Sequence, residues 1–137
     1  MTKYILDACA VVALFQKETG ADMVENLLVK AMNGRCIVSM HRMNLLEVYY
    51  GYLRDDGSTV ADKHISAIES SCINIIETIP KNLMLKAGEV KVRHRMSLAD
   101  SILIAQGILD KALVVTSDHH ELDSVDAIKD AEFFWFR

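Results

Sequence analysis

The chain has 137 residues, the length of one ordinary domain, so we expect a single domain over residues 1–137. Apolar residues make up 51% of it, and six glycines with one proline exclude collagen-like and proline-rich disordered chains. The formal net charge of −4 argues against a domain that binds nucleic acid through an overall positive charge, because such domains are usually basic.

Short apolar, β-branched runs alternate with longer segments of helical spacing. The runs are apolar on both faces, which is typical of strands buried between two layers of helices. This alternation predicts an α/β fold with a central parallel sheet and right-handed crossovers. In chain order we expect a strand at Tyr4–Leu6, a helix at Glu18–Met32, a strand at Cys36–Ser39, a helix at Met43–Arg54, a strand at Ile73–Ile76, helices at Leu83–Val92 and Leu98–Leu109 (the second broken near Gly107), and strands at Ala112–Thr116 and Phe133–Phe136.

The cysteines and the N-terminal segment predict a cytoplasmic protein. The three cysteines are odd in number, far apart and in no metal-binding spacing, so they are interpreted as free thiols in a reducing compartment. The apolar run from Tyr4 to Phe15 resembles an export signal, but Asp7 places a charge inside it. No stretch approaches the roughly 20 apolar residues of a membrane span.

Four acidic residues stand where the chain leaves predicted strands or runs along predicted helices. Asp7 and Asp118 follow the first and fourth strands, Asp100 begins a helix, and Glu47 lies within one. In open α/β sheets, ligands bind beyond the carboxyl ends of the strands. Carboxylates brought together there repel one another unless a cation neutralises them, and Mg²⁺ or Mn²⁺ prefers such oxygen ligands.

Each acid also has a purely structural interpretation. Asp7 can cap the helix that follows it, and both Asp100 and Asp118 fit capping boxes at helix starts. On a helical wheel Glu47 falls opposite the apolar side chains, which predicts a solvent-exposed glutamate. Taken separately, none of these residues identifies a metal site.

The order of these acidic residues along the chain, with the residues around them, resembles that of a known family. The chain resembles a PIN domain and, more narrowly, the VapC-type toxin ribonucleases of type II toxin–antitoxin pairs. The resemblance covers nearly the whole chain. It rests on Asp7-Ala8-Cys9-Ala10 after the first strand, Asn44-Leu45-Leu46-Glu47, Ser97-Leu98-Ala99-Asp100, Thr116-Ser117-Asp118 after the fourth strand, and the closing Trp135-Phe136-Arg137.

The resemblance implies a three-layer α/β/α fold with the sheet in the order 3-2-1-4-5. Asp7 and Asp118 would then lie side by side, with Glu47 and Asp100 arriving from helices. By carry-over, Asp7 and Asp100 are the leading metal ligands, and Asp118 completes the site directly or through water. Glu47 would orient or deprotonate the attacking water. Many relatives have Ser or Thr at the position of Cys9, which leaves the role of this residue open.

The implied activity is Mg²⁺- or Mn²⁺-dependent hydrolysis of RNA, with tRNA a candidate substrate. The implied partners are a protein antitoxin and a second copy of the chain. Without the four site carboxylates, fifteen acidic residues balance fifteen Lys and Arg, so the rest of the surface is neutral. Asn44 and Thr116 match polar positions near the acids, and Arg42, Arg93 and Arg95 would bind phosphates, although Arg93 and Arg95 also fit an ordinary solvated helix face.

Two other functions remain open at this stage. A haloacid-dehalogenase-like phosphohydrolase also places an Asp after its first strand, but expects a second Asp where this chain has Cys9. A receiver-like module binds Mg²⁺ without nuclease activity, but expects its acceptor at the end of the third strand, where this chain has Glu77 and Thr78. Both fit less well than the nuclease, as does a PIN fold that serves only as an interaction module.

Overall fold

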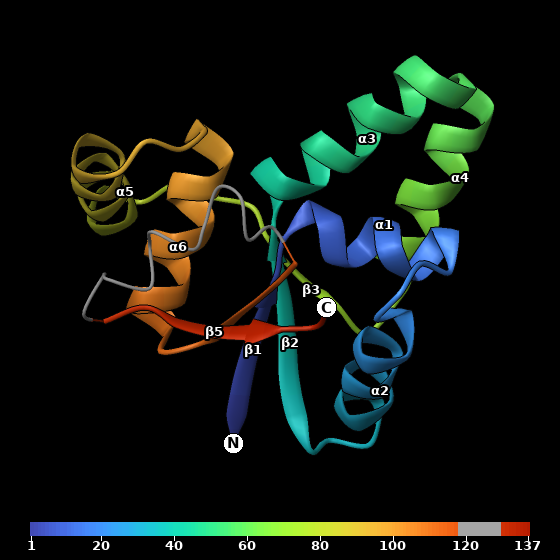
Figure 1. Cartoon of the computed structure of the whole chain (residues 1–137), viewed down its shortest axis with the longest axis horizontal. Helices are drawn as coiled ribbons and strands as arrows, with labels where there is room; N and C mark the ends of the chain where they lie inside the picture. Colours follow the sequence, from blue (N-terminus) through green and yellow to red (C-terminus); the bar gives the residue numbers. More distant parts are fainter. Residues whose placement is uncertain (118–129) are drawn as a thin grey trace.

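The computed structural model describes residues 1–117 and 130–137 of the protein. Five strands form one parallel sheet in the order β3-β2-β1-β4-β5 (Figure 1), which confirms the expected order. The strands are β1 (Thr2–Leu6), β2 (Cys36–His41), β3 (Asn74–Ile76), β4 (Leu113–Thr116) and β5 (Glu132–Trp135). The helices are α1 (Ala8–Gln16), α2 (Ala21–Met32), α3 (Arg42–Asp56), α4 (Ser58–Glu69), α5 (Lys81–Arg93) and α6 (Leu98–Asp110).

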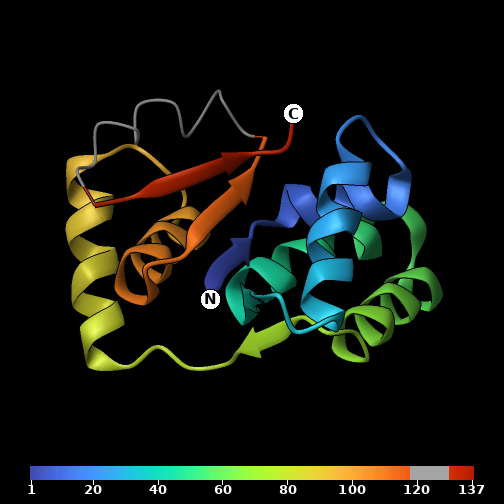
Figure 2. The same cartoon turned by 90° about the horizontal axis from the view of Figure 1, so that it is seen from below.

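Alternate residues of the central strands face two different cores. Leu6 and Val115 pack with the helices α1 to α4, whereas Ile5 and Val114 pack with α5 and α6. Figure 2 shows the two groups of helices on opposite faces of the sheet. Because both faces are covered, the strands are apolar throughout, and the expected three-layer α/β/α architecture is confirmed.

The helices depart from the sequence expectation in four places. Helix α4 was not predicted, and α1 was expected only as the helix that Asp7 can cap, without bounds. Helix α3 continues through Asp56 to a junction at Gly57, whose φ of +89° ends one helix and starts the next. The expected break at Gly107 is wrong, because α6 is continuous to Asp110. A Cβ on Gly107 would lie 2.8 Å from Cγ2 of Val114, so this glycine permits close packing of α6 on β4. Within the described residues, no helix has the length and apolar character to cross a membrane.

Candidate active site at the carboxyl edge of the sheet

Asp7 follows β1 directly and is both a helix cap and a site candidate. Its Oδ1 accepts a hydrogen bond of 2.8 Å from the backbone N–H of Ala10, so it caps α1 as the structural interpretation expected. Its own backbone N–H donates to the carbonyl of Val115 at 3.2 Å, and the side chain is 4% exposed. This cap uses Oδ1, one of the two oxygens of the carboxylate.

The end of β4 lies beside Asp7. Leu6 pairs with Val115 across the two strands, so Thr116 leaves β4 next to the point where Asp7 leaves β1. Thr116 is fully buried. Asp118, expected as a neighbour of Asp7, lies outside the described residues.

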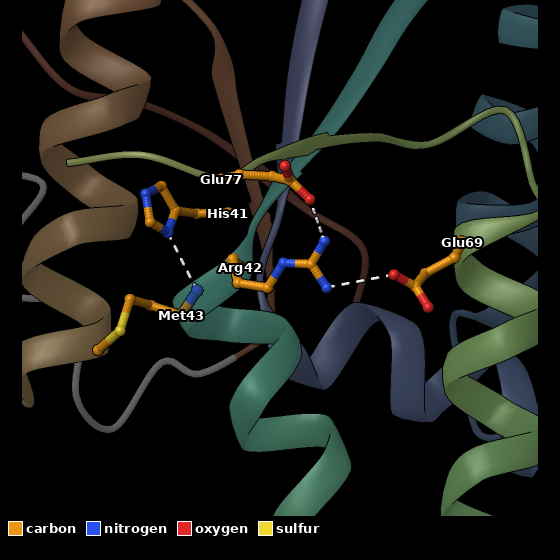
Figure 3. Close-up of polar contacts among 5 residues, drawn as sticks. All are labelled: His41, Arg42, Met43, Glu69 and Glu77. Carbon is orange, nitrogen blue, oxygen red and sulfur yellow. Dashed lines mark hydrogen bonds and ion pairs between the residues drawn. The ribbon is translucent and has the colours of Figure 1, made fainter. Parts of the chain in front are cut away.

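His41 ends β2 and fixes the start of α3. Its Nδ1 accepts from the backbone N–H of Met43 at 3.0 Å, as Figure 3 shows, and its Nε2 lies 2.9 Å from the carbonyl oxygen of Thr78. A neutral ring with its proton on Nε2 satisfies both partners. His41 is 1% exposed. The position of His41 at the end of an apolar strand, directly before a helix, was the available sequence signal for this cap.

The first turns of α3 carry two site candidates. Asn44 is completely buried, and neither its Oδ1 nor its Nδ2 has a hydrogen-bond partner among the described residues. Glu47 is half-buried rather than exposed as its spacing predicted. It lines a cleft of about 220 Å³ with residues of α1 and α3, among them Val12, Gln16 and Tyr52.

Asp100 lies in the first turn of α6 and is half-buried. Ser97 caps this helix, because its Oγ accepts from the backbone N–H of Asp100 at 3.1 Å. Figure 1 shows the first turns of α1, α3 and α6 at the same end of the sheet. Met43 of α3 packs against Leu83 of α5 and Ile102 of α6, which links the start of α3 to the opposite helical layer.

The arginines proposed to bind phosphates are placed differently from one another. Arg42 forms ion pairs with Glu77 and with Glu69, the latter at 3.2 Å (Figure 3). Hydrogen bonds to these carboxylates raise the pKa of the guanidinium, and its charge is already offset. Arg93 pairs with Glu89 at 3.3 Å on α5, whereas Arg95 is exposed between α5 and α6.

Comparison with known proteins identifies the fold family. The profile of the PIN domain matches residues 4–128. The chain belongs to the PIN domain family. Three solved structures share its fold, and each covers 98% or more of both chains: VapBC2 from Rickettsia felis bound to a promoter DNA fragment (17% identity, TM-score 0.76), DNA-bound VapBC from Salmonella typhimurium (15%, 0.72) and VapBC-1 from nontypeable Haemophilus influenzae (15%, 0.73). A search of curated proteins found no match.

PIN domain nucleases generally use divalent metal ions, and the donors of this PIN domain fit such an ion in type. Asp7 and Asp100 offer carboxylate oxygens, the hard ligands that Mg²⁺ and Mn²⁺ prefer. The buried amide of Asn44 has no hydrogen-bond partner among the described residues, as is expected of a site in which a bound ligand supplies that partner. Residues 1–117 and 130–137 contain no group of three His, Cys, Asp or Glu side chains arranged to hold a metal ion, and Asp118 lies outside them.

Proposed function

We propose that this PIN domain is a metal-dependent endoribonuclease and the toxin of a type II toxin–antitoxin pair. The observation that carries the proposal is the position of Asp7 and Asp100 in a PIN domain. Both carboxylates stand at helix starts at the carboxyl edge of the sheet, where α/β proteins bind their ligands. Backbone N–H groups at helix starts also attract negative charge, which suits a phosphodiester substrate.

The proposed roles follow from the placement of each side chain. Asp7, Asp100 and Asp118 would hold Mg²⁺ or Mn²⁺, with Glu47 completing the site. When bound, the ion supplies Lewis-acid activation and neutralises charge on the phosphodiester. Glu47, at the rim of its cleft, would orient or deprotonate the attacking water. The remaining polar candidates would orient substrate and site, and these are Asn44, Thr116, Arg42, Arg93 and Arg95.

The proposed protein partner is an antitoxin. The solved structures that share the fold include complexes of toxin and antitoxin. On this chain, an apolar pocket of about 280 Å³ lies between α3 and α4, lined by residues that include Leu46 and Tyr49, and Leu46 is 50% exposed. Exposed apolar side chains of this kind suit a partner segment or a second copy of the chain. We place the toxin in the cytoplasm, where RNA and antitoxin are found.

Cleavage of total cellular RNA, with structured tRNA included, tests the activity. Purified protein is incubated with Mg²⁺, with Mn²⁺ and with EDTA, beside the Asp100→Asn variant. We expect discrete fragments that disappear with EDTA and in the variant. Circular dichroism verifies that the variant is folded, since the substitution keeps the size of the side chain. Cleavage by Asp100→Asn at the normal rate would show that the site is wrongly assigned.

A further inference from the structure

Phe136 and Arg137, which follow β5, join three segments at the carboxyl edge of the sheet. The backbone N–H of Phe136 donates to the carbonyl of Thr116 at 3.2 Å, which extends the pairing of β5 with β4. The guanidinium of Arg137 then reaches two different segments. Its Nη1 donates to Oε1 of Glu18 at 3.3 Å and to the carbonyl of Thr19 at 3.2 Å, while its Nη2 donates to Oγ of Ser117 at 3.2 Å.

The turn between α1 and α2, residues 17–20, is shaped to receive these two residues. Gly20 has a φ of +91°, and a Cβ at this position would lie 2.3 Å from the carbonyl oxygen of Phe136. Only glycine allows so close an approach without displacing the backbone. Phe136 is 2% exposed and packs in the core with α1 and α2. Phe136 and the turn at residues 17–20 are therefore in close-packed contact.

Ser117 connects this contact to the active-site candidates along the chain. It follows Thr116 directly, and Val115 accepts the backbone hydrogen bond from Asp7. Asp118 is the next residue in the sequence. Figure 2 shows the end of β5 beside the end of β4. Arg137 thus binds a residue that lies between two site candidates in the sequence.

We propose that Arg137 is a positioning residue of the active site. Its hydrogen bond to Ser117 holds the chain where it leaves β4, and its contacts with Glu18 and Thr19 anchor the guanidinium. A planar guanidinium suits this task because it presents several donors in a fixed fork, whereas a lysine offers one flexible ammonium. The inference rests on the proposed nuclease function and adds a residue that acts through its hydrogen bond to Ser117.

A double-mutant cycle between Arg137 and Ser117 tests the inference. Residues that orient metal ligands typically contribute tenfold to a hundredfold to activity or metal affinity. We expect Arg137→Ala and Ser117→Ala each to lower kcat by at least about tenfold at unchanged KM, with no further loss in the double variant. Arg137→Lys should resemble Arg137→Ala, because lysine lacks the fixed fork whose two nitrogens reach the two segments. Glu18→Gln is the matched control, since it keeps an acceptor for the anchor and should retain activity.

Mn²⁺ affinity, measured by electron paramagnetic resonance of the free ion, provides a second readout that does not depend on cleavage. Both single alanine variants should bind Mn²⁺ more weakly than the wild type at temperatures where circular dichroism shows them folded. Additive losses, unchanged kcat and Mn²⁺ affinity, or a raised KM alone would overturn the inference, the last because it indicates direct contact with RNA. If the wild type cleaves and the variants match it, only the inference fails. A wild type that neither cleaves RNA nor binds Mn²⁺ overturns the proposed function as well.

Discussion

Replacing Asn44 by leucine tests whether the buried amide lowers the stability of the fold for the benefit of the site. Both amide atoms are buried, and neither has a partner among the described residues. Leaving a buried polar group unpaired costs about 1–3 kcal/mol, and an apolar group of the same shape removes that cost. Leucine has the same branching and number of heavy atoms as asparagine. We therefore expect the free energy of unfolding to rise by about 1–3 kcal/mol.

Thermal unfolding followed by circular dichroism, in EDTA and without RNA, measures the effect. For a chain of this length about 1 kcal/mol corresponds to roughly 3–4 °C, so Tm should rise by about 3–12 °C. Asn26→Leu on the exposed face of α2 is the matched control and should stay within about 0.5 kcal/mol of the wild type. The same Asn44→Leu protein should cleave RNA more slowly than the wild type.

Two results would refute this reasoning. If Asn44→Leu is less stable than both the wild type and Asn26→Leu, removing the buried amide does not stabilise the fold and the expected gain is refuted. If the variant is more stable and cleaves RNA at the wild-type rate, the amide has no role in the site. A stabilised variant with lower activity is the outcome that the buried, unpartnered amide predicts.

Three further predictions concern the packing of the fold, at the carboxyl edge of the sheet and away from it. His41→Ala should lower the free energy of unfolding by about 2–4 kcal/mol in denaturant titrations, because it removes the cap of α3 and the partner of the Thr78 carbonyl. His41→Asn keeps an acceptor for the cap, so its free energy of unfolding should fall by less. Gly107→Ala should lower Tm, because overpacking against Val114 costs about 1–3 kcal/mol and outweighs a helix-propensity gain of about 1 kcal/mol. A raised Tm would show that α6 can move away from β4 and relieve the contact. Burial raises the pKa of the Cys36 thiol, so in the native protein a disulfide reagent at pH 8 should modify it last of the three cysteines, and rapid labelling of Cys36 would contradict this. The folded state should also lose stability as the pH rises past the unfolded thiol's pKa of about 8.5, because this thiol then ionises only in the unfolded chain.

The strands were predictable because burial on both faces leaves continuous apolar runs in the sequence. The same feature hid the extent of α1. The apolar run from Tyr4 to Phe15 contains both β1 and α1, and only Asp7 marks the boundary, because α1 has little polar face to reveal a helical period. Helix α4 was missed because it follows α3 after the single residue Gly57, where a longer loop was expected.

The candidate site was predictable where local signals exist and not where side chains from distant segments meet. Asp7 and Asp100 follow from strand ends and helix starts, which the sequence shows directly. Glu47 was expected to be exposed, because a helical wheel does not include α1, which forms the other wall of its cleft. Arg42 was grouped with free cations, since nothing local indicates that Glu69 and Glu77 meet it.

Three helix caps connect the stability of the fold to the geometry of the site. Asp7, His41 and Ser97 each accept a hydrogen bond from a backbone N–H in the first turn of a helix, and each of these helices begins at the carboxyl edge of the sheet. A cap typically contributes about 1 kcal/mol, so the interactions that start α1, α3 and α6 stabilise the fold and at the same time fix the first turns that carry the site. Asn44 differs, since it lies in one of these first turns fully buried and gains no such bond from the described residues. The unpaired amide of Asn44 thus lowers the stability of the fold at a position in the proposed site. Substitution of Asn44 should therefore raise stability while lowering activity.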